Sequence, residues 1–245
     1  MTDTPAGLTY GGYLRLDRLL SSQEPLSELH DEMLFIVIHQ TKELWLKQAI
    51  HELKLAQALV REDRPVEAYK SLSRITRIQA VMTTSWDVLA TMTPVDYSRF
   101  RHVLGTSSGF QSAGFREFEF RLGVKHSSYL AQATAEERPA LEAALAEPSL
   151  WDDANAALAR HGLEGEAGWE AVYRSPERYW DLYQLAEKLV DVDDALATWR
   201  HKHVLTVERI IGGKMGTGGS AGVAYLTSTL TKRAFPELWA LRTRL

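Results

Sequence analysis

The chain contains no cysteine among its 245 residues. This absence excludes disulfides, thiolate metal sites, iron–sulfur clusters and cysteine nucleophiles, and it favours a reducing compartment. No segment approaches the roughly 18 consecutive apolar residues of a membrane-spanning helix, and no signal peptide opens the chain. The net charge of -4 does not indicate a protein that binds nucleic acid or an anionic membrane, since such proteins are usually basic. We therefore expect a cytoplasmic protein with neither partner.

Glycine and proline are also scarce, with 16 and 8 residues, which excludes collagen-like and low-complexity chains. The composition, 45% hydrophobic and 24% charged, is that of an ordinary globular protein. The length fits one large domain or two small ones. We expect a single domain over residues 1–245.

Helical periodicity dominates the pattern, and we find no alternating strand pattern, hairpin signal or internal repeat. Apolar residues recur every three or four positions over 28–60, 66–92 and 177–212. The segment from about 126 to 175 is rich in alanine and glutamate and predicts short helices joined by turns. We predict an all-α fold, a bundle of long antiparallel helices.

One glycine-rich segment, GGKMGTGGSAG at 212–222, lies between the last long helix and the C-terminal helix. It lacks the Lys-Ser/Thr pair that closes a P-loop. Two interpretations stay open, a simple interhelical linker and a loop that closes over a ligand.

Two histidines, His39 and His203, lie in apolar helical segments. Either one alone is most simply a hydrogen-bonded core histidine. Together, on two helices, they could hold a haem, with one imidazole on the iron and the other side open to oxygen. His201 points away from His203 on a helix, and the HExxH motif of zinc sites is absent.

Arg101 has apolar and aromatic neighbours, so we expect its guanidinium to pair with a carboxylate. From the residues alone an internal ion pair is favoured over a ligand. Asp191, Asp193 and Asp194 indicate a solvated helix face, and the GxSxG motif of serine hydrolases is absent. These patterns predict a helical protein that binds a planar cofactor between helices.

Several stretches together resemble the haem-dependent tryptophan 2,3-dioxygenase family, in the family's order and over more than half the chain. Among them are FIVIHQ, YSRFRHVLGTSSGFQS and WRHKH followed by GTGGS. The matching segments are 8–23, 30–48, 96–119, 178–212, 216–226 and 235–243.

The resemblance implies a haem b with His203 as the proximal iron ligand, and Ser108 and Gly109 lying along the haem. It implies that His39 is the distal, catalytic histidine, close to the indole N–H of the substrate and not bound to iron.

The resemblance also implies that Phe35 and Tyr97 line the substrate pocket. Arg101 would bind the substrate carboxylate, and Thr217 its ammonium and carboxylate groups. The spacing agrees, because Phe35 and His39, and likewise Tyr97 and Arg101, are four residues apart and share a helix face.

Tyr10 and Tyr13 match tyrosines that reach into a neighbouring subunit's pocket in the family. The resemblance therefore implies a homo-oligomer, usually a tetramer.

The reaction implied is insertion of both atoms of O2 across the indole C2–C3 bond of L-tryptophan, giving N-formylkynurenine in the first step of the kynurenine pathway. Three features depart from the family: a short 126–177 region, Lys42, which we interpret as solvated or interfacial, and the small pair Ala113-Gly114. Two alternatives therefore stay open, a related haem enzyme of secondary metabolism acting on a substituted indole or tryptophan analogue, and a haem- or indole-binding sensor without turnover.

Overall fold

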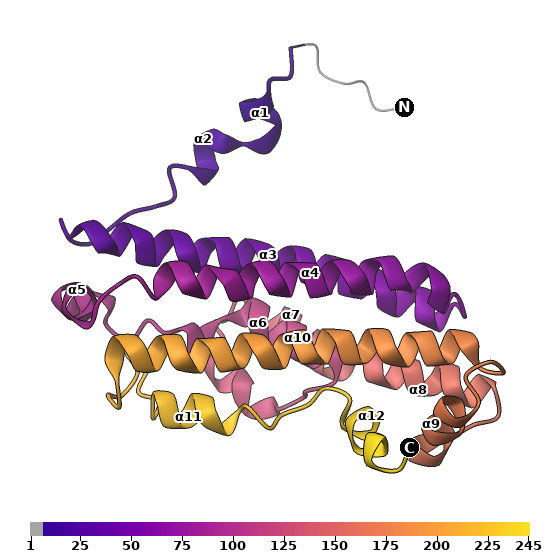
Figure 1. The fold of residues 1–245 in the computed structure, drawn as a ribbon. Coiled ribbons are helices and arrows are strands. Elements are labelled where there is room, and N and C mark those ends of the chain that lie inside the picture. The colour runs from indigo at the N-terminus through magenta and orange to yellow at the C-terminus, as the bar shows by residue number, and fades with distance from the viewer. Residues whose placement is uncertain (1–6) are drawn as a thin grey trace.

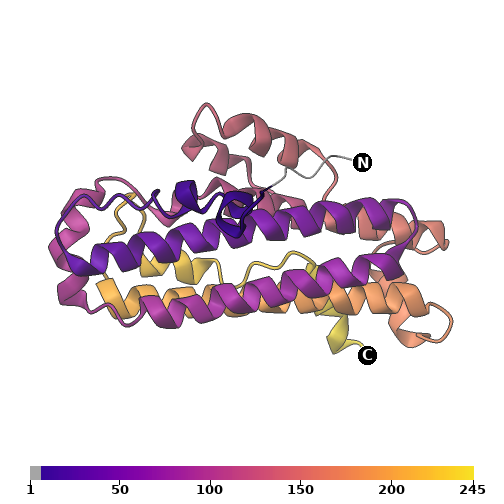
Figure 2. The same cartoon turned by 90° about the horizontal axis from the view of Figure 1, so that it is seen from above.

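Three long helices run the length of the molecule in the computed structural model, which describes residues 7–245 (Figures 1 and 2). They are α3 (His30–Arg61), α4 (Pro65–Leu89) and α10 (Trp180–Ile211). Helix α3 is antiparallel to the other two, whereas α4 and α10 run in the same direction (Figure 1). Every regular element in the described range is helical, which confirms the all-α prediction.

The long helices form because each has one continuous apolar face. On α3, Ile38, Leu46, Leu53 and Val60 follow one another at seven or eight residues and are all buried. Burying each such side chain contributes about 1.5–3 kcal/mol, which far exceeds intrinsic helix propensity. Packing of the three apolar faces therefore builds the main core.

Shorter helices cover the ends and one side of this bundle (Figure 1). Among residues 7–245, no helix is both long enough and apolar enough to cross a membrane. The remaining elements are α1 (Tyr10–Leu14), α2 (Leu16–Leu19), α5 (Pro94–Phe100), η1 (Arg101–Leu104), η2 (Gly109–Gln111), α6 (Ala113–Leu122), η3 (Ser127–Gln132), α7 (Arg138–Ala146), α8 (Leu150–Arg160), α9 (Gly165–Arg174), α11 (Val223–Ser228), α12 (Pro236–Ala240) and η4 (Leu241–Thr243).

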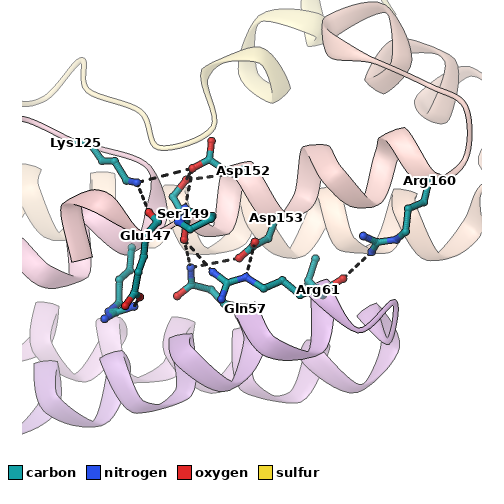
Figure 3. A network of polar contacts seen from close by, with 11 residues as sticks. Gln57, Arg61, Lys125, Glu147, Ser149, Asp152, Asp153 and Arg160 are labelled. Atoms are coloured by element: carbon teal, nitrogen blue, oxygen red, sulfur yellow. Dashed lines mark hydrogen bonds and ion pairs between the residues drawn. The ribbon is translucent and has the colours of Figure 1, made fainter. Parts of the chain in front are cut away.

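The middle of the chain consists of short helices, as predicted, and polar contacts attach it to α3 (Figure 3). The Arg61 guanidinium lies 2.7 Å from the Asp153 carboxylate of α8. The Gln57 amide donates to the Pro148 carbonyl oxygen at 2.9 Å and to Asp153 Oδ2 at 3.4 Å. Asp153 is almost fully buried, so these contacts satisfy a charge that could not otherwise stay inside.

Asp193 is the connection between α10 and the C-terminal segment. Its Oδ2 accepts hydrogen bonds from the backbone N–H groups of 234 and 235, at 2.9 and 3.3 Å, and from Trp239 Nε1 at 3.0 Å. The predicted solvated face holds for the exposed Asp191 and Asp194, but it is wrong for Asp193, which has no exposed surface. The reason is that position 193 faces the core.

We expect Asp193→Ala to lower the free energy of unfolding by about 3 kcal/mol, because three donors lose a charged acceptor in a buried place. Urea unfolding followed by circular dichroism measures the change. Asp194→Ala, next in the chain and exposed, is the control and should stay within about 0.5 kcal/mol of the parent. Equal losses in the two variants would contradict the role of Asp193.

Candidate active site

A cavity of about 460 Å³ lies between α3, α4 and α10. Its size is within the usual range for small-molecule and cofactor sites. The 107–112 segment and the glycine-rich loop complete its wall. Of the residues predicted from the sequence, the cavity is lined by Phe35, His39, Tyr97, Ser108, Gly109, His203 and Thr217.

Helix α3 contributes one face to this cavity, formed by Phe35, His39, Lys42 and Leu46. These positions are three or four residues apart, so the helical repeat alone places them in a row. The ring centres of Phe35 and His39 are 4.2 Å apart, and those of Phe35 and Tyr97 are 6.0 Å apart. The pocket wall expected beside the distal imidazole is therefore present.

A hydrogen bond orients the His39 ring. Its Nδ1 lies 2.7 Å from the Phe35 carbonyl oxygen, and because a carbonyl only accepts, Nδ1 carries the hydrogen. Burial is the main cause that lowers the pKa of His39; the hydrogen bond to the Phe35 carbonyl opposes it, the charge of Lys42 adds to it, and the resulting pKa is about 4. The ring is thus neutral at pH 7, and its Nε2 is a hydrogen-bond acceptor.

His203 reaches the same cavity from α10. Its ring stacks on the Trp86 ring of α4 with centres 4.3 Å apart, and it contacts Trp199 at 5.2 Å. Burial lowers the pKa of His203 to about 3, so its imidazole is neutral, the form that ligates a metal. The structure therefore brings the two histidines, 164 positions apart in the sequence, to one site.

The glycine-rich loop lies against the segment before η2. The Thr217 hydroxyl donates to the Ser107 carbonyl oxygen at 2.5 Å. A Cβ at Gly218 would lie 2.7 Å from Ser108 Cβ, so only glycine allows this approach. Because several loop residues line the cavity, the loop forms part of its cover, and the simple-linker interpretation is incomplete.

Arg101 follows α5, whose start is fixed by Pro94 and by a capping box between Thr93 and Asp96. Its Nη2 donates to the Met215 carbonyl oxygen in the glycine-rich loop. Within residues 7–245 no carboxylate pairs with Arg101, so the favoured internal ion pair is wrong. Arg101 is not among the residues that line the cavity. Tyr97, one helical turn earlier, is one of them, so the guanidinium lies next to the cavity.

The other two residues expected at the site lie outside this chain's own cavity. Tyr10 and Tyr13 are on α1, and their side chains are 78% and 72% exposed. Figure 1 shows α1 and α2 standing away from the bundle, and neither helix has a buried residue.

The structure adds cavity-lining residues that the sequence analysis missed. Lys42, interpreted as solvated or interfacial, is 5% exposed, so that interpretation is wrong. Trp86, Trp199, Arg116 and Arg200 also line the cavity. Spacing could have found Trp199, which precedes His203 by four residues, as Phe35 precedes His39.

The residues present fit the haem that the resemblance implies. The neutral imidazole of His203 faces the cavity from α10. The flat rings of Trp86 and Trp199 form part of the cavity wall. At Gly109 a Cβ would meet nothing within 4 Å, which leaves open space beside the backbone. A planar group held by His203 suits this donor set and shape.

The depressed pKa of His39 makes stability depend on pH. Between pH 6.5 and about 4, His39 binds a proton in the unfolded state but not in the folded state. The free energy of unfolding therefore falls as the pH falls. His39→Phe should reduce this loss in the haem-free protein by up to about 3 kcal/mol. Urea unfolding at pH 7 and pH 4.5 measures it, and identical pH dependence in the two proteins would contradict the buried neutral ring.

Comparison with known proteins gives matches along the whole chain. The family model described as Tryptophan 2,3-dioxygenase matches residues 2–169 and 143–245. A tryptophan 2,3-dioxygenase of Caulobacter vibrioides is 60% identical, with 97% of this chain and 98% of the relative covered. Enzymes of the same name from Bacillus cereus and from a Bradyrhizobium species are 48% and 50% identical. They cover 100% and 97% of this chain, and 95% and 93% of their own lengths are matched.

These alignments extend over 261 to 265 positions, more than the 245 residues of this chain, so the relatives have residues that it lacks. The two matched ranges of the family model overlap at residues 143–169, within the 126–177 region that the sequence analysis expects to be short. Because the matches are full-length and close, the chain belongs to the tryptophan 2,3-dioxygenase family.

Proposed function

We propose that this chain is a haem-dependent dioxygenase that cleaves the indole C2–C3 bond of L-tryptophan with O2 and forms N-formylkynurenine, opening the kynurenine pathway. The observation that carries the proposal is the meeting of His39 and His203 at one cavity in a chain of this family. Both oxygen atoms stay in the product, so no external reductant is consumed. The relatives' names favour this reaction over oxygenation of a substituted indole in secondary metabolism.

In this proposal the cofactor is haem b, which supplies the site for O2 and the oxygen chemistry when bound. His203 would hold the iron through its neutral imidazole. Ser108 and Gly109 would lie along the porphyrin, since both line the cavity and Gly109 leaves room beside its backbone.

The remaining pocket residues would bind and orient the amino acid. Phe35 and Tyr97 offer aromatic surface for the indole ring. The Nε2 of His39 is placed to accept the indole N–H, because Nδ1 is already donating to the Phe35 carbonyl oxygen. Arg101 and Thr217 would take the carboxylate and ammonium groups, and the planar guanidinium suits a carboxylate. Binding the amino acid in one fixed orientation would be the main contribution of these residues to the rate.

We also propose that residues 1–245 act as one domain and that the protein is a homo-oligomer, with the family's usual tetramer as the expected form. Tyr10 and Tyr13 would complete the pocket of a neighbouring subunit. Their exposure supports this, because both side chains are free to contact a partner surface and α1 buries no residue against its own chain. A cytoplasmic location rests on the composition and the lack of cysteine.

The test is mass spectrometry of the product after haem-loaded, reduced protein is mixed with L-tryptophan and isotopically labelled O2. We expect N-formylkynurenine with two labelled oxygen atoms. One labelled atom, or turnover of indoles without a carboxylate only, would indicate the secondary-metabolism type of enzyme. A normal haem spectrum without turnover would indicate a sensor.

We expect Arg101→Ala to keep the haem spectrum and to weaken tryptophan binding by about 2–4 kcal/mol, since the substrate carboxylate loses its charged partner. Titration of the haem absorption with L-tryptophan measures the dissociation constant. Arg99→Ala, on the exposed side of α5, is the matched control and should bind tryptophan normally. Unchanged affinity in Arg101→Ala would refute the role.

A further inference from the structure

Lys42 is a buried lysine in the cavity wall. It lies one turn after His39 on α3 and is 5% exposed. Its Nζ lies 2.7 Å from the centre of the Trp86 ring. Among residues 7–245 this nitrogen has no hydrogen-bond partner and no ion pair.

A lysine in such a place is expensive for the fold. Contact with the Trp86 ring recovers only part of the free energy that taking an ammonium out of water costs. In the surroundings that the chain provides, burial lowers the pKa of Lys42 to about 6. A methionine or leucine would fill the same space without this cost. The charge is therefore useful only if a ligand brings its counter-charge.

The other charged side chains that line the cavity are two arginines and two carboxylates. Arg116 and Arg200 share a single carboxylate, Glu119, at 2.6 and 2.7 Å, and all three side chains are buried. The Nε of Arg116 has no partner among the described residues. The other carboxylate in the lining, Glu43, is exposed and accepts from the Ser112 hydroxyl.

Aromatic contacts connect Trp86 with the two helices that carry these arginines. The Trp86 ring, on which Lys42 lies, contacts Trp199 with centres 5.5 Å apart, and Trp199 stacks on Phe115 at 4.9 Å. Arg200 and Arg116 directly follow Trp199 and Phe115 in the sequence. Both arginines have a carboxylate partner, so Lys42 is the one basic side chain in the described lining without one, and this favours an anionic occupant.

We propose that Lys42 binds a carboxylate of the molecule that occupies the Trp86 end of the cavity. The proposal rests on the proposed function, in which two occupants have carboxylates, the porphyrin and the amino acid. Arg101 lies beside Tyr97 at the Phe35 end, and Lys42 is seven residues, or about 10 Å, further along α3 than Phe35. A tryptophan carboxylate held by Arg101 is therefore remote from Lys42, and a propionate of the porphyrin is the favoured source.

The first experiment measures the rate at which haem leaves the protein for an excess of a haem-scavenging apoprotein. Lys42→Met keeps the side-chain length and removes the charge, Lys42→Arg keeps the charge, and Lys47→Met is the control on the exposed side of α3. We expect haem to leave Lys42→Met at least tenfold faster than the parent, Lys42→Arg and Lys47→Met. With the dimethyl ester of haem, which lacks carboxylates, the parent and Lys42→Met should lose the cofactor at the same rate.

The second experiment compares L-tryptophan with tryptamine, which lacks the carboxylate, by titrating the haem absorption of the loaded parent and Lys42→Met. A tenfold loss for tryptophan with unchanged tryptamine binding supports the proposal with the substrate as the carboxylate source. Changes below twofold in both experiments overturn it. Failure of the parent to bind haem would instead overturn the proposed function, so the two failures are distinguishable.

Discussion

Trp86 lies where the three long helices meet. Its ring, on α4, stacks on His203 of α10 and also touches Trp199 of the same helix, while the ammonium of Lys42 reaches it from α3. Trp86 therefore contacts both helices that carry the histidines, and it lines the cavity itself. Because protein interiors are closely packed, a change of size at this side chain would be felt on both helices.

The candidate site residues lie on two kinds of element, long regular helices and irregular segments. His39 and His203 are on helices of 32 residues each, whose backbone bonds and buried faces fix where an imidazole points. The groups expected to hold the amino-acid end, Arg101 and Thr217, lie on a 3-10 turn and a glycine-rich loop. Rigid helices suit the reacting centre, where the side chains need a fixed geometry. Irregular segments suit the entrance, which must open for the substrate.

Much of the fold could be predicted from the sequence, because long amphipathic helices are encoded locally. The segments predicted at 28–60, 66–92 and 177–212 correspond to α3, α4 and α10 within a few residues. Lys42 and Asp193 could not be predicted, since whether a charged residue on a helix is buried depends on what packs against it from elsewhere in the chain. The roles of the site residues came from the family resemblance, since spacing alone left a core histidine as good an interpretation as a ligand.

The hydrogen bond from Arg101 to the Met215 carbonyl oxygen joins the substrate-binding candidate to the loop above it. Where the substrate carboxylate takes the Nη2 donor of Arg101, it replaces this neutral acceptor with a charged one, which is the stronger partner. Capture of the amino acid is then a ligand exchange, in which the 212–222 loop loses a tether as the carboxylate arrives. A molecule with the same ring but without an acidic group has no carboxylate to replace the Met215 carbonyl oxygen. The hydrogen bond between Arg101 and the loop then stays in place.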